Sequence, residues 1–241
     1  MFGKWSRPNY NSVVATFCYN IWRNLPITIS DPSRVLELIH IDDVITAFRS
    51  CLDGVAPTPG YKYLSAGPTY TITLGELAAR LQSYRDAATR GPLPDLSDRF
   101  TRLLYSTFLS FRDVLDCRTT LDKKNDSRGT LIELIKSPHT GQVFFSRTRP
   151  GITRGNHYHH TKAETFWVLE GTAVIRIQNL ATGRIASFTV DSAEVASVTI
   201  PPGCAHSITN IGESDLITLF WTTEIFDPAT PDTYTFEVPH E

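Results

Sequence analysis

Residues 151–171 read GITRGNHYHHTKAETFWVLEG, and residues 201–210 read PPGCAHSITN. Around them the chain is rich in short runs of β-branched and aromatic residues, separated by Gly, Asn, Asp and Pro, and this pattern predicts β-strands. We expect strands at 142–147, 165–169, 173–178, 186–190, 198–200 and 217–221. Short strands that follow one another every roughly 8–12 residues are typical of a β-sandwich or β-barrel. The C-terminal part of the chain is therefore predicted to be an all-β domain.

The sequence changes character near residue 115. Before that point apolar residues recur at helical spacing, which predicts helices over 11–22, from 42 onward, over 73–84 and over 100–111. Asn11 is the candidate N-cap of the first helix, and Asp42 and Asp43 suit the start of the second. Thr73 and Glu76 have the spacing of a capping box at the third.

A chain of 241 residues has room for one or two domains. We predict two, a helix-rich α/β domain over 1–115 and an all-β domain over 116–241. Hydrophobic residues at 41% and charged residues at 20% are typical of a globular protein and exclude a disordered, collagen-like or coiled-coil chain. Lys and Arg number 23 against 25 Asp and Glu, with no basic stripe, so we expect no nucleic-acid partner.

Cysteine usage and the lack of targeting signals predict the compartment. The four cysteines are scattered with no CxxC pair, which favours reduced thiols over a disulfide framework. The first residues, MFGKWSRPNYN, lack the basic and apolar segments of a signal peptide. No apolar run approaches the ~20 residues that span a bilayer. We therefore expect a cytoplasmic protein with no membrane partner.

Histidines gather in the two stretches quoted first. Side chains alternate between the faces of a strand, so His157 and His159 are expected to point the same way. Glu164 follows after a short connection, and His206 follows a Pro-Gly turn on a later strand. Three imidazoles and a carboxylate that converge inside a β-barrel suit a divalent transition metal. The remaining isolated histidines are interpreted as structural: His40, His139 and His240.

The two stretches resemble the paired motifs of the cupin superfamily, G-x5-HxH-x3,4-E-x6-G and G-x5-PxG-x2-H-x3-N. The first motif matches over 151–171 and the second over 201–210, with Val195 in place of its leading Gly, a turn position that leaves the ligand positions intact. The resemblance implies a cupin β-barrel or jelly roll. It also implies four metal ligands, His157, His159, Glu164 and His206. Zinc is the expected metal, with iron, manganese or nickel as alternatives.

Two segments, RGNHYHHTKAE and FDPATPDTYTFEV, are closer still to the cupin half of CapF-type capsular polysaccharide synthesis enzymes. FGKWSRPNYNSVVATF and LIHIDDVITAF are similar to the C-terminal half of an extended short-chain dehydrogenase/reductase. CapF-type enzymes join these modules, and the resemblance implies that the cupin epimerises C3 of a UDP-4-keto-6-deoxy-N-acetylhexosamine before the reductase reduces C4 with NADPH. It further implies capsular or O-antigen polysaccharide biosynthesis, sugar-nucleotide contacts from Arg7, Asn9 and Asn11, and a homodimer by analogy with other cupins.

The sequence lacks the motifs with which such a reductase binds NADPH. None of the 14 glycines falls in a GxxGxxG or GxGxxG array, whose bare amides would approach a pyrophosphate. The catalytic Tyr-x-x-x-Lys is absent from 1–115, and Tyr158 and Lys162 have that spacing by coincidence, inside the metal motif. The chain resembles such an enzyme without the N-terminal half of its reductase. We expect no NAD(P) and no reductase activity in it.

Epimerisation beside a ketone needs a base for the α-proton and stabilisation of the enolate. Outside the ligand set, His160 and Lys162 are the candidate bases and Tyr234 is a candidate acid. Four protein ligands around a tetrahedral zinc would make the site structural, whereas an open position would let the metal polarise the C4 carbonyl. Two other interpretations stay open: a cupin dioxygenase that uses iron, and a non-catalytic remnant that binds metal or sugar and dimerises.

Overall fold

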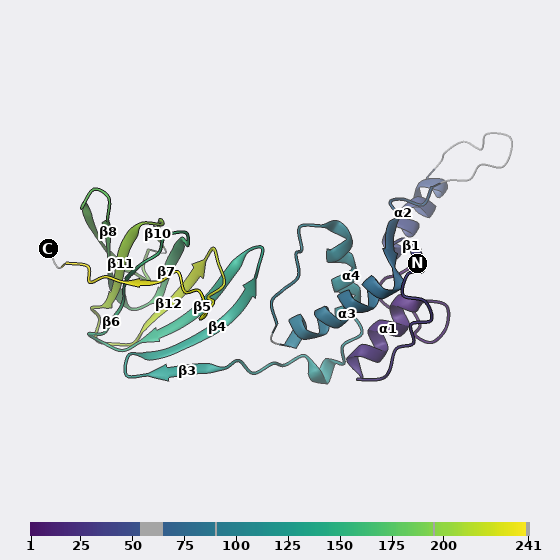
Figure 1. Cartoon of the computed structure of the whole chain (residues 1–241), viewed down its shortest axis with the longest axis horizontal. Helices are drawn as coiled ribbons and strands as arrows, with labels where there is room; N and C mark the ends of the chain where they lie inside the picture. Colours follow the sequence, from purple (N-terminus) through teal and green to yellow (C-terminus); the bar gives the residue numbers. More distant parts are fainter. Residues whose placement is uncertain (54–64, 90, 195, 240–241) are drawn as a thin grey trace. The chain divides into compact units, whose positions relative to one another are not determined.

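The computed structural model describes residues 1–53, 65–89, 91–194 and 196–239 (Figure 1). They form two compact units, Met1–Thr119 and Thr120–Glu241, each with its own hydrophobic core. Val195 and His240 lie outside the described residues. Within the described ranges, no helix is long and apolar enough to cross a membrane.

The first unit is built from helices and one small antiparallel sheet. In chain order its elements are α1 (Val13–Trp22), β1 (Val35–Leu38), α2 (Ile41–Leu52), β2 (Tyr70–Thr73), α3 (Leu74–Thr89), α4 (Arg99–Leu109) and the 3-10 helix η1 (Val114–Asp116). Strand β1 pairs with β2. The four helices agree with the four predicted from apolar spacing.

The N-caps of the first two helices precede or follow the residues singled out in the sequence. Ser12, rather than Asn11, caps α1, because its hydroxyl accepts a first-turn amide at 3.2 Å. His40 caps α2, because its Nδ1 accepts the amide of Asp42 at 3.3 Å. Asp42 and Asp43 therefore lie in the first turn, where acidic side chains interact favourably with the helix dipole.

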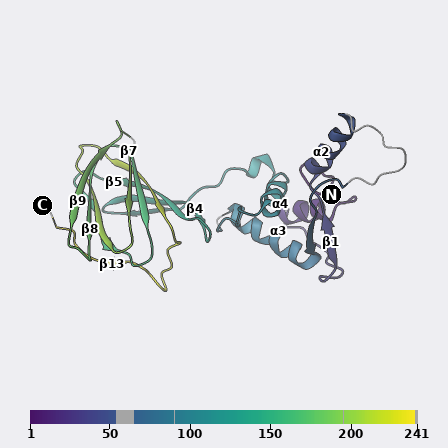
Figure 2. The same ribbon diagram turned by 90° about the horizontal axis from the view of Figure 1, so that it is seen from above.

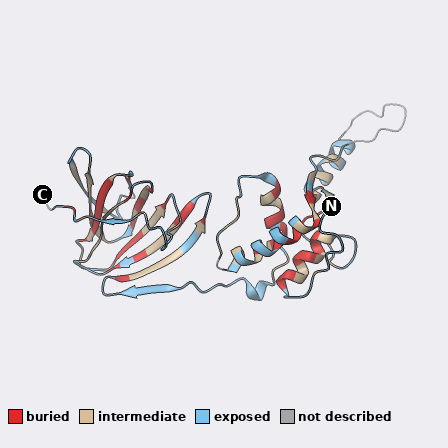
Figure 3. Ribbon diagram, viewed as in Figure 1, coloured by how far each residue is buried: buried red, intermediate tan, exposed pale blue. Residues whose placement is uncertain are grey.

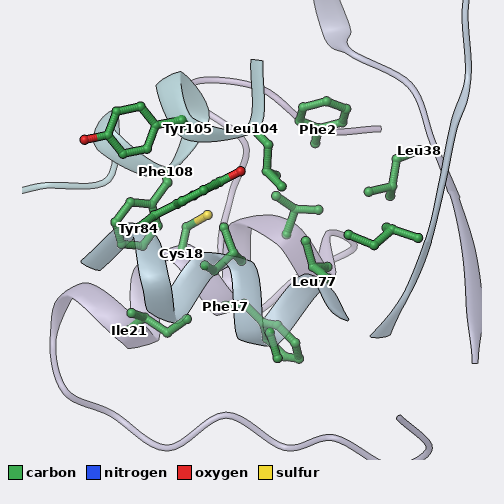
Figure 4. Close-up of a cluster of buried hydrophobic side chains, with 14 of the residues drawn as sticks. Phe2, Phe17, Cys18, Ile21, Leu38, Leu77, Tyr84, Leu104, Tyr105 and Phe108 are labelled. Carbon is green, nitrogen blue, oxygen red and sulfur yellow. The ribbon is translucent and has the colours of Figure 1, made fainter. Parts of the chain in front are cut away.

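The capping box before α3 is confirmed. Glu76 Oε2 accepts the amide hydrogen of Thr73 at 2.9 Å, and Thr73 Oγ1 accepts that of Glu76 at 3.2 Å. The helix that begins here packs against α1 and α4, and the buried side chains between the three helices form the core of the unit (Figure 4). Phe2 and Leu38 belong to the same cluster.

The second unit consists of two antiparallel sheets that face each other (Figures 1 and 2). Its strands are β3 (Lys123–Asp126), β4 (Gly129–Ser137), β5 (Gly141–Thr148), β6 (Thr153–Tyr158), β7 (Glu164–Glu170), β8 (Thr172–Asn179), β9 (Ile185–Asp191), β10 (Ser197–Ile200), β11 (Cys204–Asn210), β12 (Leu216–Thr222) and β13 (Tyr234–Thr235). One sheet has the order β10-β7-β12-β5-β4-β3 and the other β13-β6-β11-β8-β9. This mainly β architecture of two facing sheets confirms the predicted β-barrel or jelly roll.

Apolar side chains from both sheets form one buried cluster. The buried residues, red in Figure 3, lie on strands of both sheets. Because side chains alternate along a strand, alternate residues of β7, β8 and β10 belong to this cluster. The cluster includes Phe166, Val168, Ile175, Ile208 and Leu216. These residues come from strands of both sheets, so the apolar cluster joins the two sheets.

Strand β6 carries a β-bulge at Asn156. His157 lies opposite His206 of β11, but the next residue of β11, Ser207, lies opposite Gly155, so the pairing passes over Asn156. The backbone of Asn156 has φ of 56° and that of Gly155 has φ of 90°. Asn and Gly adopt such positive φ values more readily than other residues, so this pair suits a bulge.

The bulge changes which side chains of β6 point inward. Arg154 lies opposite Ile208, a residue of the interior cluster, and His157 lies opposite the buried His206. Directly opposite residues share a face, so Arg154 and His157 both point inward although they are three positions apart. The Arg154 Nε donates to Thr148 Oγ1 of the facing sheet at 2.9 Å, in agreement with this orientation.

Candidate metal centre

The four predicted metal ligands lie together in the second unit. His157 stands near the end of β6, His159 just after it, Glu164 at the start of β7 and His206 within β11. One potential ligand atom from each lies within 4.8 Å of those of the other three. His159 and His206 are buried, and His157 and Glu164 are partly buried.

Two of the histidines face the carboxylate. His206 Nε2 lies 3.0 Å from Glu164 Oε2, and His159 Nε2 lies 3.3 Å from Oε1. Atoms that bind one metal at about 2.0–2.2 Å are themselves about 3 Å apart, so these separations suit a shared cation. The His157 ring centre lies 4.5 Å from that of His206 and 4.8 Å from that of His159.

Buried nitrogen atoms test whether a cation fits here. Among the described residues, neither Nε2 of His159 nor either ring nitrogen of His206 has a hydrogen-bond partner. His159 Nδ1 donates to the main-chain carbonyl of Asp232, which leaves the Nε2 of the neutral ring unprotonated toward Glu164. A buried lone pair that faces a carboxylate is repelled unless a cation lies between them. The donor set of three imidazoles and one carboxylate fits a divalent transition metal.

The electrostatics of the site favour the protonation states that bind metals. Burial, with a smaller contribution from His206, lowers the pKa of His157 to about 4, so its ring is neutral at neutral pH. Burial by itself raises the pKa of Glu164, but the contacts of its carboxylate with His159 and His206 outweigh that effect and hold the pKa well below its usual range. Neutral imidazoles and an ionised carboxylate are the forms that coordinate a metal.

Asp232 lies in the FDPATPDTYTFEV segment, for which the sequence predicts no role beyond the resemblance, and it supports the loop that carries His159. Its Oδ1 accepts the amide hydrogen of His160 at 2.8 Å, and its Oδ2 accepts those of Thr161 and Lys162 at 2.9 and 3.0 Å. Desolvation alone raises the pKa of Asp232, but these hydrogen bonds outweigh it and lower the pKa well below its usual range. Asp232 is therefore an anion held by the backbone of the ligand loop.

Aromatic rings line one side of the histidine cluster. The Phe166 ring meets the His206 ring edge-on, with the centroids 5.5 Å apart, and the Phe220 ring lies 4.6 Å from Phe166. Such a hydrophobic wall limits solvent access and fixes the orientation of the ligand ring.

The three predicted acid–base residues fall into two places. Lys162 is buried, with its amino group 6.0 Å from the centre of the Phe226 ring. His160 and Tyr234 are exposed and contact each other, with ring centroids 4.7 Å apart. Tyr234 also stacks on Tyr158, the last residue of β6, whose side chain points to the face opposite that of His157. Of the three, Lys162 alone is buried, as His159 and His206 are.

The predicted sugar-nucleotide contacts lie in the first unit, before α1. Arg7, Asn9 and Asn11 are all exposed. The Arg7 guanidinium lies 5.6 Å from the Tyr10 ring centre, and the main-chain N–H of Asn9 donates to Thr16 Oγ1 at 2.9 Å. These residues share one short segment, in the unit that does not carry the four metal-binding side chains.

Comparison with known proteins gives relatives for the chain. Residues 124–234 match the polysaccharide biosynthesis C-terminal domain family. Over 238 residues the chain is 40% identical to the UDP-2-acetamido-2,6-beta-L-arabino-hexul-4-ose reductase of Pseudomonas aeruginosa, an alignment that spans 99% of this chain but 63% of the reductase. It is also 27% identical over 122 residues to the spore coat polysaccharide biosynthesis protein SpsL of Bacillus subtilis, which corresponds to 46% of this chain and 81% of SpsL.

A solved structure extends the relationship to the fold. The capsular polysaccharide assembling protein CapF of Staphylococcus aureus matches with a TM-score of 0.89 and 40% identity, over 98% of this chain and 69% of CapF. Sequence and fold thus agree along nearly the whole described chain, including the stretches that hold the four clustered ligands. On this evidence the chain belongs to the CapF family of capsular polysaccharide proteins, and its second unit is the cupin domain of that family.

Proposed function

We propose that the cupin unit is a metal-dependent epimerase that inverts C3, next to the ketone, of a UDP-4-keto-6-deoxy-N-acetylhexosamine. The observation that carries the proposal is the convergence of three histidines and one glutamate within the jelly roll. The Pseudomonas relative is named as the reductase of a UDP-linked hexul-4-ose, a 4-keto sugar nucleotide, which supports this substrate class. Zinc is the proposed metal, and cytoplasmic synthesis of capsular or O-antigen polysaccharide is the proposed setting.

A bound divalent metal would supply Lewis-acid stabilisation of the charge that develops on the C4 oxygen. The side chains that would hold it are His157, His159, Glu164 and His206. Phe166 excludes water on one side of this cluster, where it contacts His206. A base of the chain takes the C3 proton, and the electron pair of that bond forms the enolate. Return of a proton to the opposite face inverts the carbon.

We assign the base to Lys162 first, because it is buried and lies between two ligands in the chain. His160 and Tyr234 are the alternatives, and their mutual contact predicts that variants of either residue disturb the other. Arg7, Asn9 and Asn11 are proposed to contact the sugar nucleotide, since a guanidinium matches a diphosphate. A homodimer is proposed as well, and a monomer in sedimentation velocity would contradict it.

The test follows hydrogen exchange at C3 without NADPH. The full chain is incubated with UDP-4-keto-6-deoxy-N-acetylhexosamine in D2O, and deuterium at C3 is measured by NMR. We expect exchange by the wild type and by His139→Ala, which changes an exposed histidine of the same unit. Exchange should be lost in His206→Ala and in Lys162→Met.

Each result that departs from this expectation contradicts a different part of the proposal. Exchange that survives His206→Ala would leave the epimerase standing and make the metal structural. Loss of exchange in His160→Gln or Tyr234→Phe, with Lys162→Met active, would move the acid–base role to the exposed pair. Absence of exchange in a folded, metal-loaded wild type would contradict the activity for this chain, and oxygen consumption with bound iron would favour a dioxygenase.

A further inference from the structure

The C-terminal segment, defined here as residues 227–239, lies along β6. Tyr234 and Thr235 form β13, which pairs with the end of β6. The amide of Phe236 donates to the carbonyl of Asn156 at 2.9 Å, and that of Val238 donates to Asn156 Oδ1 at 3.4 Å. The Val238 side chain is only 2% exposed, so the segment is packed on the barrel rather than free.

The loop between β6 and β7 is held by this segment. The loop follows Tyr158 and ends before Glu164, and it carries His159. Three consecutive amides of the loop, those of residues 160–162, donate to the Asp232 carboxylate, and the Thr161 hydroxyl donates to it at 3.0 Å. Hydrogen bonds to an ionised acceptor are about twice as strong as neutral ones. The Asp232 carboxylate therefore accepts hydrogen bonds from three main-chain amides and one hydroxyl of the loop.

The same residue orients a ligand ring. The main-chain carbonyl of Asp232 accepts the Nδ1 hydrogen of His159. That bond fixes which ring nitrogen is protonated and turns Nε2 toward Glu164. Asp232 thus holds the loop by its side chain and the imidazole by its backbone.

We propose that Asp232 is a positioning residue of the metal centre, which docks the C-terminal segment on the ligand loop and thereby sets the metal affinity of His159. The inference rests on the proposed metal-binding function. It goes beyond that function because Asp232 is not a ligand: affinity should fall when its carboxylate is removed, although all four ligands remain.

The experiment measures Zn²⁺ affinity by competition with a chromophoric chelator, and hydrogen–deuterium exchange of the 160–162 amides in the metal-free chain. Asp232→Ala should weaken Zn²⁺ binding about 10–100-fold and speed exchange of these amides. Asp232→Asn, which keeps one acceptor oxygen, should lose less. Asp227→Asn is the matched control, because Asp227 lies in the same segment and its hydrogen bonds are to Ala229 and Thr230. Circular dichroism establishes that each variant folds.

The possible results distinguish failure of the inference about Asp232 from failure of the proposed metal-binding function. Unchanged Zn²⁺ affinity in folded Asp232→Ala would overturn the inference and leave the metal site intact. A fall in thermal stability without a change in affinity would have the same meaning, because it would show that Asp232 has a structural role only. Equal loss of affinity in Asp227→Asn would also overturn it. A wild-type chain without Zn²⁺ affinity would overturn the proposed metal function itself.

Discussion

His159 and Asp232 are joined by a hydrogen bond from a ring nitrogen to a main-chain carbonyl, across 73 residues of sequence. Because the acceptor belongs to the backbone, the bond depends on where the C-terminal segment lies and only indirectly on the side chain at position 232. The orientation of a candidate metal ligand is therefore determined by packing between distant parts of the chain, and the metal in turn should stabilise that packing.

Removal of metal should destabilise the cupin unit alone. A ligand at 1,000 times its Kd stabilises the folded state by about 4 kcal/mol, and EDTA would remove that contribution. The core cluster of the first unit contains none of the four ligands, so its unfolding should be unaffected. Differential scanning calorimetry with and without Zn²⁺ should show one transition that shifts and one that does not. A shift of both would mean that the units unfold together.

Phe166→Ala should destabilise the cupin unit by about 3–5 kcal/mol, because it opens a cavity in the interior. Phe166 is 2% exposed and contacts both Phe220 and His206. The control is Phe188→Ala, since Phe188 is 44% exposed. Urea unfolding measures both variants, and similar losses in the two would contradict the packing described.

The stability of the first unit should fall in acid because of His40. Burial lowers the pKa of His40 below its ordinary value of 6.5, although Asp42 and Asp43 oppose the shift. The unfolded chain then binds more protons at this residue, so its stabilising contribution is present above about pH 6.5 and is lost as the pH falls through the folded pKa. Protonation also removes the Nδ1 acceptor that caps α2.

The measurement compares thermal unfolding of the wild type and His40→Asn between about pH 8 and about pH 5. Asn caps a helix but does not titrate, so the wild type should lose more stability than the variant over this range. Parallel pH profiles for the two proteins would show that His40 does not contribute.

Thr73→Ala should cost the first unit about 0.5–2 kcal/mol, the usual effect of removing an N-cap hydroxyl. The substitution removes the hydroxyl that accepts the Glu76 main-chain amide hydrogen. The hydrogen bond from the main-chain amide of residue 73 to the Glu76 carboxylate is kept. Thr71→Ala, at an exposed position of the same strand, is the matched control for chemical denaturation. An equally large loss of stability in Thr71→Ala would show that the effect comes from strand propensity and not from the cap.

The fold and the ligand cluster could be predicted because their signals are local. Strand spacing indicated a sandwich or barrel, and the two motifs placed Glu164 and His206 beside the histidines. Strand alternation alone does not place His157, because the bulge at Asn156 brings it to the same face as Arg154. Since β6 ends at Tyr158, His159 reaches the cluster from the loop that follows. Its position is set by Asp232 and not by the alternation of a strand.

Asp232 could not be predicted from a pattern, because a carboxylate that accepts distant amides leaves no periodicity or spacing in the sequence. The cap of α1 was misplaced for a related reason. Asn11 and Ser12 are both good caps, and only the path of the backbone decides between neighbours.

The bulge in β6 has a consequence for how chains of this family can change in length. The pairing of β6 with β11 passes over Asn156, so removal of this residue would leave the ladder continuous, with Arg154 and His157 still opposite their partners. What removal would take away are the acceptors for the amides of Phe236 and Val238. The extra residue in the strand and the C-terminal segment that binds it are therefore expected to be inherited as a pair, so that relatives without one should also be without the other.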